Sequence, residues 1–300
     1  MSSLILAILC LLRGNFIVWV PFHFMWIFFS TFSQKLKNII INLFIFACVI
    51  SPITYLNYIA SGNFILITSQ GGQNFYTGNN PENSTGYYIP LSFVRPSALY
   101  EESDFKKEAE VRTGKKLSPH EVSGFWCNES LKYFWNNPKV FITNLFKKTV
   151  IYFDWYEIPD NYDFYNIKDK SFIQYLTFLN FPLLWGFSFI AFLRLNTFEK
   201  KYLLILLLVY SASVICFFIY SRYRIPALFF LIIFASSGIE FLFDILRKKN
   251  YRTFIINLVL VILISANLSL NPFRMTVDKN AMKTIIEKRL KASKQNQNQQ

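Results

Sequence analysis

The sequence has little of what metal-dependent and nucleotide-dependent enzymes use. It contains two histidines, His23 and His120, and neither has a second ligand at a spacing typical of zinc sites. No Gly-Lys-Ser/Thr phosphate loop, no Gly-x-Ser-x-Gly turn and no closely spaced cysteine pair is present. These absences argue against a histidine zinc site, a P-loop and a serine-hydrolase turn, and we predict no metal site and no bound cofactor in the chain.

Charge is nearly missing from six long runs, each close to the roughly 20 residues that a bilayer-spanning helix needs. The runs cover residues 16–33, 39–60, 172–193, 202–220, 225–246 and 254–270. Residues 2–12 are also apolar, but they are long enough for only about half a bilayer. The sequence therefore predicts an all-α polytopic membrane protein with about six full transmembrane helices plus a partial first one.

The remaining residues divide the chain into four parts. Residues 1–60 hold the N-terminal membrane segments, residues 61–172 form a polar loop domain of mixed helical and irregular structure, residues 173–270 form a four-helix membrane region, and residues 271–300 are a polar tail that we expect to be disordered. Function is expected where the loop domain meets the membrane.

Basic residues cluster in short turns between the apolar runs, at residues 34–37, 194–201 and 247–252. Such turns are typically cytoplasmic, which places Arg13, the 61–172 loop, the 221–224 turn and the tail on the outer face. The basic tail opposes this orientation. The formal net charge of +13 is explained by topology, so we predict the lipid bilayer as a partner and no nucleic acid.

Within the loop domain, residues 64–68 favour a β conformation, and four glycines between residues 69 and 86 predict tight turns with positive φ. A short helix is expected from residue 104 to 113, stopped by Gly114. Ser118 and Glu121 form a capping-box pattern that opens a helix running to about residue 136. Residues 139–155 predict an amphipathic helix lying on the bilayer surface.

Three arginines lie at predicted membrane boundaries: Arg13 after the first apolar run, and Arg222 and Arg224 between two spans. A guanidinium at that depth is costly unless it meets an anion, and phosphate matches its planar fork. In an extended turn, positions i and i+2 point the same way, so Arg222 and Arg224 are predicted to hold one lipid phosphate. The alternative is that they reach to lipid headgroups.

The glycine-rich run also carries polar side chains that suit a carbohydrate. Tyr76, Asn79 and Asn80 are predicted to hydrogen-bond sugar hydroxyls from a mobile cover over the site. A simple set of surface turns is the alternative. Asp154, Glu157, Asp160 and Asp163 are acids near the boundary, and we interpret them as solvated residues unless the chain proves active alone.

Five sequence motifs occur in order: "LLRGN", "GGQNFYTGNNPENSTG", "LSPHEVSGFW", "NNPKVFITNLFKKTVIYFDWYEIPDNYDFY" and "YSRYRIPALFFLIIFAS". Over residues 5 to 270 the chain resembles the C-terminal half of bacterial polytopic glycosyltransferases of the GT-C superfamily. The resemblance is to the branch of protein mannosyltransferases and of enzymes that modify lipid A.

The resemblance implies transfer of a sugar from a polyprenyl-phosphate donor to a lipid, glycan or protein acceptor, on the outer face of a bacterial cytoplasmic membrane that the chain crosses several times. The family's catalytic acid lies in a first outer loop that has no counterpart in this sequence. We therefore predict no catalytic residue in this chain and expect it to be a fragment, inactive alone. An O-antigen ligase or polymerase and a non-catalytic membrane subunit remain open alternatives.

Overall fold

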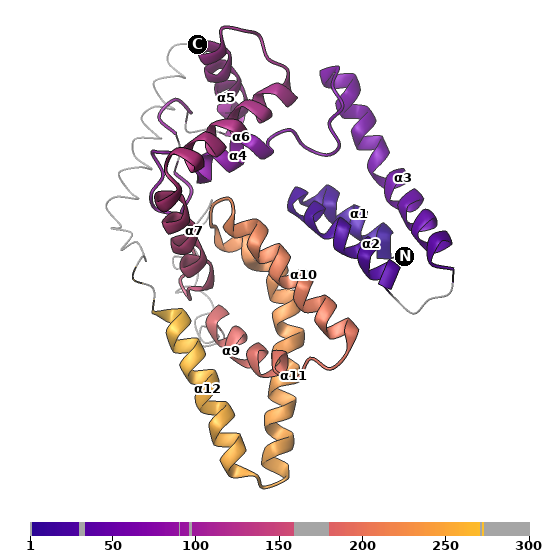
Figure 1. Ribbon diagram of the computed structural model, residues 1–300, viewed down its shortest axis with the longest axis vertical. Helices are drawn as coiled ribbons and strands as arrows, with labels where there is room; N and C mark the ends of the chain where they lie inside the picture. The colour runs from indigo at the N-terminus through magenta and orange to yellow at the C-terminus, as the bar shows by residue number, and fades with distance from the viewer. Residues whose placement is uncertain are drawn as a thin grey trace, which may run out of the picture. The chain divides into compact units, whose positions relative to one another are not determined.

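The computed structural model describes residues 2–29, 34–89, 91–95, 98–158, 180–270 and 272 (Figure 1). Within these residues the regular structure is helical and no β-strand is formed. The chain divides into two compact units, one comprising Met1–Leu145 with Cys216–Phe218 and the other comprising Phe146–Ile215 with Ile219–Pro272. The division falls inside helix α7 (Pro138–Phe153). Each unit is described by itself below.

Three helices among the described residues are long and apolar enough to cross a membrane: Lys35–Ser61, Ser221–Arg247 and Tyr251–Ser269. Shorter apolar helices cover Ser2–Leu12, Gly14–Phe29 and Phe181–Phe192. The helical, membrane-type architecture expected from the sequence is confirmed at this level. The count of six full spans stays a prediction, because part of the run 172–193 lies outside the described residues.

The first unit begins with α1 (Ser2–Leu12), the 3-10 helix η1 (Gly14–Trp19) and α2 (Val20–Phe29), which pack beside the long α3 (Lys35–Ser61). Figure 1 shows α1 and α2 together next to α3. The sequence predicts one continuous helix from residue 16, but the α-helix begins only at Val20. Pro21 lies in its first turn, where its missing N–H costs no hydrogen bond.

A polar network joins α1, α2 and α3. The Ser3 hydroxyl lies 2.8 Å from His23 Nε2 and donates to Asn42 Oδ1, also at 2.8 Å. The single hydroxyl proton of Ser3 is directed to Asn42. In the hydrogen bond between Ser3 and His23 the imidazole is therefore the donor, and the hydrogen-bond network assigns its proton to Nε2. The sequence could not find these partners, since they lie 20 and 39 residues apart from Ser3.

Helix α3 ends at Gly62, whose φ of 68° requires the left-handed conformation that glycine tolerates. The chain then folds back along α3 in an irregular conformation, although a strand was predicted for residues 64–68. In a sheet, the backbone carbonyls of residues 65–67 would accept hydrogen bonds from a neighbouring strand. Here they accept from side chains of α3: Thr54 donates to Leu66 O, and Asn57 donates to Ile65 O and Ile67 O. The strand prediction is therefore wrong here.

The polar segment of the first unit contains α4 (Gly71–Gly78), α5 (Ala98–Thr113) and α6 (Pro119–Asn136). The last two confirm the sequence prediction, with α5 beginning earlier than expected and ending at Gly114, whose φ is 67°. The backbone N–H of Ser118 donates to the Glu121 carboxylate at 2.8 Å, which is one half of the capping box. Trp126 is fully buried among aromatic and aliphatic side chains of this core.

Helix α4 contradicts the prediction of glycine-rich turns over residues 69–86. Three of the four glycines lie in this helix, and of the four only Gly86 has a positive φ. A Cβ on Gly72 would lie 1.8 Å from the carbonyl oxygen of Ser123, and the Gly72 N–H donates to Ser123 Oγ at 3.0 Å. Glycine at this position allows α4 to approach α6 closely, and it does not mark a turn.

The second unit contains the C-terminal part of α7, α9 (Phe181–Phe192), α10 (Phe198–Ile215), the 3-10 helix η3 (Ser221–Arg224), α11 (Ile225–Arg247) and α12 (Tyr251–Ser269). Helix α9 packs against both α11 and α12 at glycines: a Cβ on Gly238 would lie 2.1 Å from Phe187 O, and one on Gly186 would lie 2.5 Å from Ser265 Oγ. Small residues at crossings are typical of packed membrane helices.

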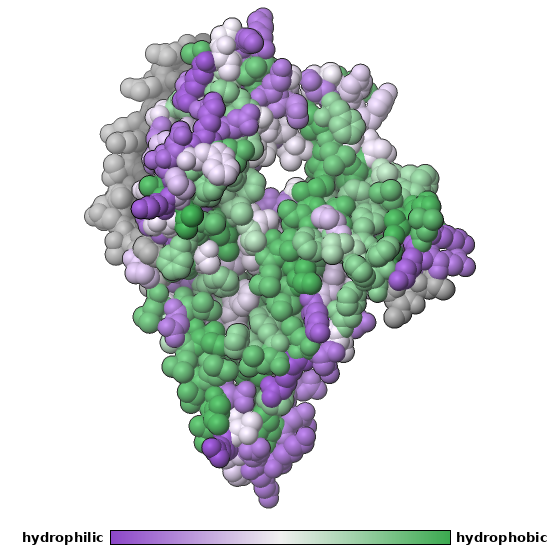
Figure 2. Space-filling model, viewed as in Figure 1, coloured by the Kyte–Doolittle hydropathy of each residue, from purple (hydrophilic) through white to green (hydrophobic). Residues whose placement is uncertain are grey.

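The outer faces of α11 and α12 are apolar. Figure 2 shows hydrophobic surface along these two helices down to the hydrophilic turn that joins them. Phe229 and Phe243 of α11, and Ile256 and Ile262 of α12, are each more than half exposed. Because exposure of so many large apolar side chains is unfavourable in water, these faces fit a lipid environment.

Candidate functional site

The turn between α10 and α11 carries the two arginines that the sequence singles out. Residues Ser221–Arg224 form a 3-10 helix, and Pro226 lies in the first turn of α11. The sequence argument requires an extended turn, in which Arg222 and Arg224 point the same way. In the observed conformation Arg222 is exposed and Arg224 is only 2% exposed, so the two side chains do not converge.

The guanidinium of Arg224 is held inside the second unit by five acceptors. Nη1 and Nη2 donate to three backbone carbonyls, one hydroxyl and one carboxylate. The acceptors are Tyr152 O (3.3 Å), Asp154 O, Tyr156 O (3.0 Å), Ser221 Oγ (2.8 Å) and Glu157 Oε2 (2.7 Å). The aromatic ring of Phe181 lies 4.8 Å from the guanidinium carbon. With its donors engaged in this way, Arg224 fixes the chain after α7 and does not present itself to a ligand.

The same segment is tied to η3 and α10 by further hydrogen bonds. The Ile158 N–H donates to Ser221 Oγ, and Tyr210 Oη donates to the carbonyl of Tyr223 at 3.1 Å. Tyr152 Oη and Ser211 Oγ lie 2.9 Å apart, both buried. Burial of the phenol raises the pKa of Tyr152 well above its usual range, so it stays a neutral hydroxyl. The turn that carries Arg222 is therefore anchored on several sides.

Two of the four boundary acids lie in this segment. Glu157 forms the ion pair with Arg224, and its side chain is 32% exposed. Asp154 is buried, and its backbone carbonyl is one of the acceptors of Arg224. Asp160 and Asp163 lie outside the described residues. Neither described acid matches the interpretation of a fully solvated boundary residue, because one is buried and the other is held by a guanidinium.

Arg222 is the exposed cation of the turn. Its guanidinium lies 5.6 Å from the ring of Tyr220 and 5.2 Å from that of Tyr223, and Nη2 is 3.4 Å from Tyr223 Oη. Two tyrosine rings beside a guanidinium orient it by cation–π attraction while leaving it accessible. Arg13, the third predicted arginine, belongs to the first unit, where it is half-buried and extended between α1 and η1.

The asparagines predicted to contact sugar are buried at the C-terminal end of α4. Asn80 is fully buried; its amide donates to Tyr76 O and Thr77 O, and its Oδ1 accepts from Glu82 N. Asn79 is 4% exposed and donates to Phe75 O and Cys216 O. The Tyr76 ring is 8% exposed and packs on Trp126.

A residue that the sequence argument missed completes this arrangement. Asn83 is 2% exposed; its amide donates to Thr77 O and Tyr87 O, and its Oδ1 accepts from Thr85 N and Gly86 N. The asparagines thus act as backbone substitutes that fold the chain after α4. This geometry favours a packed turn over the predicted mobile cover.

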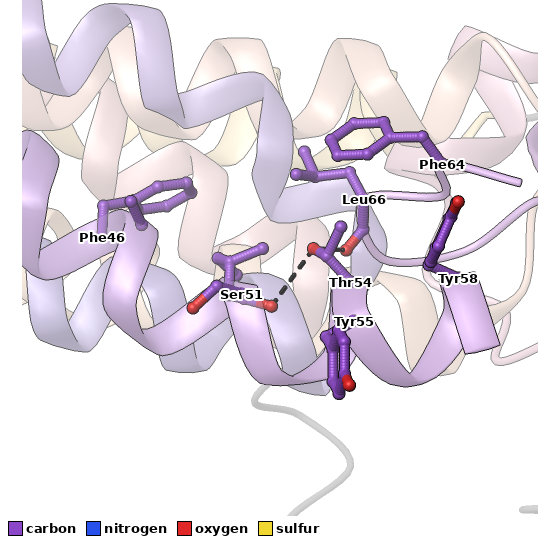
Figure 3. A pocket seen from close by; sticks show the side chains of 9 residues that line it. Phe46, Ser51, Thr54, Tyr55, Tyr58, Phe64 and Leu66 are labelled. Carbon is purple, nitrogen blue, oxygen red and sulfur yellow. Dashed lines mark hydrogen bonds between the residues drawn. The ribbon is translucent and has the colours of Figure 1, made fainter.

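Helix α3 carries an open apolar groove of about 420 Å³ (Figure 3). Phe46, Thr54 and Tyr55 contribute one side, and Phe64 and Leu66 of the returning segment contribute the other. Figure 3 shows the hydrogen bond from Thr54 that holds the segment in place. The groove is nearly free of polar atoms, so it suits hydrocarbon and offers nothing to a sugar or a phosphate.

Comparison with known proteins found no matching family model, no matching curated protein and no matching solved structure. Among the described residues, no group of three or more histidine, cysteine, aspartate or glutamate side chains is placed to hold a metal ion. The argument for function therefore rests on the anchored turn at residues 221–224.

Proposed function

We propose that this chain is the C-terminal portion of a membrane glycosyltransferase that acts on a polyprenyl-phosphate sugar donor. In this proposal Arg222 binds the phosphate of the lipid carrier, and Arg224 positions Arg222 by holding the turn. The sugar would pass to a lipid, glycan or protein acceptor at the outer face of a bacterial cytoplasmic membrane. The proposal assigns no catalytic base to the described residues.

The observation that carries the proposal is an exposed guanidinium at a rigidly held helix start. Arg224 is buried and donates to five acceptors, and these hydrogen bonds fix the backbone of the turn that carries Arg222. When a sugar leaves a carrier phosphate, negative charge grows on that phosphate. A cation placed there in advance stabilises the transition state more than the ground state, because no reorganisation is needed during the reaction. The ordered motifs that resemble the transferase family support the same assignment.

Phosphate binding is tested on the purified full chain in lipid nanodiscs, titrated with polyprenyl phosphate and with the corresponding polyprenol. The wild type should bind the phosphate more tightly. A charge-assisted contact contributes about 1.5–3 kcal/mol, so Arg222→Ala should weaken phosphate binding roughly 10- to 150-fold. Arg222→Lys should recover only part of the loss, since it keeps the charge without the planar fork.

Arg252→Ala is the matched control, because Arg252 is an exposed arginine at the N-terminal end of α12. It should leave binding unchanged. Equal affinity for the phosphate and the alcohol, or an unchanged affinity in Arg222→Ala, would refute the role of Arg222. Transfer itself is measured by supplying a labelled polyprenyl-phosphate sugar to membranes that contain the chain. The proposal expects phosphate binding without transfer by this chain alone, because it assigns no catalytic base to the described residues, and turnover would overturn that expectation.

The topology that accompanies the proposal places the segment between α3 and α9 outside. Cys127, on α6, is the only cysteine of this segment and is partly exposed. A membrane-impermeant maleimide should label it in spheroplasts, with the denatured protein as control for a free thiol. Labelling that requires lysis would place the segment inside and overturn the orientation.

A further inference from the structure

A second pocket lies in the second unit, where the C-terminal ends of α9 and α11 meet the N-terminal end of α10. Its volume is about 390 Å³ and its walls are of mixed character. Apolar side chains, among them Phe234 and Phe241, line one part, and charged side chains line the rest. Nothing in the proposed transferase function uses this pocket.

The charged lining contains both signs. Arg194 and Lys200 supply two cations, and Glu240 and Asp244, one helical turn apart on α11, supply two carboxylates. Among the residues that the structure describes, no ion pair joins the two signs across the pocket; Asp244 instead lies 4.0 Å from Arg247. Opposite charges that share a pocket and stay apart leave room for a ligand that itself carries both signs.

The guanidinium of Arg194 lies over the ring of Phe241, which also lines the pocket. Its central carbon is 3.0 Å from the centroid of the Phe241 ring. Partial burial of the head lowers the pKa of Arg194, because the charged form loses hydration there. A cation that is partly desolvated by an aromatic ring is stabilised further by an anion that approaches its N–H groups.

We infer that this pocket binds the headgroup of a phospholipid that carries a primary ammonium group, as in phosphatidylethanolamine. The phosphate would meet Arg194 and Lys200, the ammonium would meet Glu240 and Asp244, and the apolar wall would cover the glycerol and first methylenes. The pocket opens at helix ends of a membrane-type unit, which is the depth of lipid headgroups.

The charges also argue against other lipids. A phosphatidylglycerol headgroup carries no cation, so it would leave the two carboxylates without a partner. A choline headgroup cannot donate hydrogen bonds to them, and the Phe241 face that could receive its methyl groups is already covered by Arg194. A free phosphate ion would leave the carboxylates and the apolar wall without a partner.

The test uses the full chain, delipidated in detergent, with bound lipid measured by native mass spectrometry. Phosphatidylethanolamine should bind about tenfold more tightly than phosphatidylcholine or phosphatidylglycerol, because one charge-assisted contact accounts for at least that factor. Glu240→Gln should remove the preference, whereas Arg194→Gln should weaken the binding of all three lipids, because each of them carries the phosphate. These residues are exposed, so neither change should prevent folding.

Glu199→Gln and Arg252→Gln are matched controls, since both residues are exposed and neither lines the pocket. They should keep the preference. A pocket with equal affinity for the ethanolamine and choline lipids, or one that prefers phosphatidylglycerol, would overturn the inference. So would displacement of the lipid by soluble glycerophosphoethanolamine at equal concentration, because that result would identify a free phosphoester as the ligand.

Discussion

Replacement of Arg224 tests the claim that this residue is an internal anchor and not a ligand contact. Its side chain is 2% exposed and donates to the carbonyls of Tyr152, Asp154 and Tyr156. Arg224→Ala leaves these carbonyls without a donor; the bonds to Tyr152 and Asp154 are buried, and the bond to Tyr156 is partly buried. Each buried unsatisfied group costs about 1–3 kcal/mol, so at the low end the three together cost about 3 kcal/mol.

The ion pair with Glu157 adds little to this sum. The Glu157 side chain is 32% exposed, and water can replace the lost guanidinium there. The destabilisation is therefore local and falls on residues 152–158. A cost of about 3 kcal/mol raises the population of the open segment on the order of 100-fold.

Hydrogen–deuterium exchange of the peptide covering residues 152–158 measures this population directly, provided that reclosing is faster than exchange. Exchange should rise on the order of 100-fold in Arg224→Ala, and less in Arg224→Lys, because an ammonium has three donors and can serve part of the acceptor set. Arg222→Ala is the control two residues away and should leave the peptide unchanged. Exchange in Arg224→Ala within about threefold of wild type would show that the contacts do not hold the segment.

Two further predictions concern the first unit. Gly72→Ala places a Cβ 1.8 Å from Ser123 O, so α4 and α6 must separate. Thermal unfolding in detergent should show that the free energy of unfolding falls by about 1–3 kcal/mol. Gly71→Ala is the control and should cause no such loss, because there is open space at its Cβ. The Arg95 side chain holds the pKa of Asp104 below its ordinary value of 3.8. The resulting stability is present above pH 3.8 and should be lost as pH falls through the lowered value. Acid titration of unfolding should show this loss, and Asp104→Asn should abolish it.

The parts of the fold that were predictable depend on short-range chemistry. The capping pattern at Ser118 and the stop at Gly114 involve residues within four positions of one another, and both helix ends are observed. The apolar runs that became α11 and α12 are set by composition alone. Each of these signals is complete within a single segment of sequence.

Helix α4 could not be predicted because its Gly72 serves a partner 51 residues away. A glycine that allows two backbones to approach and a glycine that allows positive φ are the same letter in the sequence. The asparagines that follow α4 pose a similar problem, since an amide that replaces backbone hydrogen bonds and an amide that binds sugar have the same composition. Burial separates the two cases, and burial is a property of the tertiary structure.

The two arginines of the 221–224 turn illustrate the same limit at the candidate site. In an extended chain, side chains at positions i and i+2 are about 360° apart around the chain axis, so they point the same way. In a 3-10 helix they are about 240° apart, so they diverge. The 3-10 conformation depends in turn on acceptors 67 to 72 residues earlier in the chain. Arg224 could therefore be recognised as an anchor only once those acceptors were in place. Because Arg224 is fixed inward, Arg222 faces outward on the other side of the turn, and we therefore propose Arg222 as the residue that contacts the phosphate.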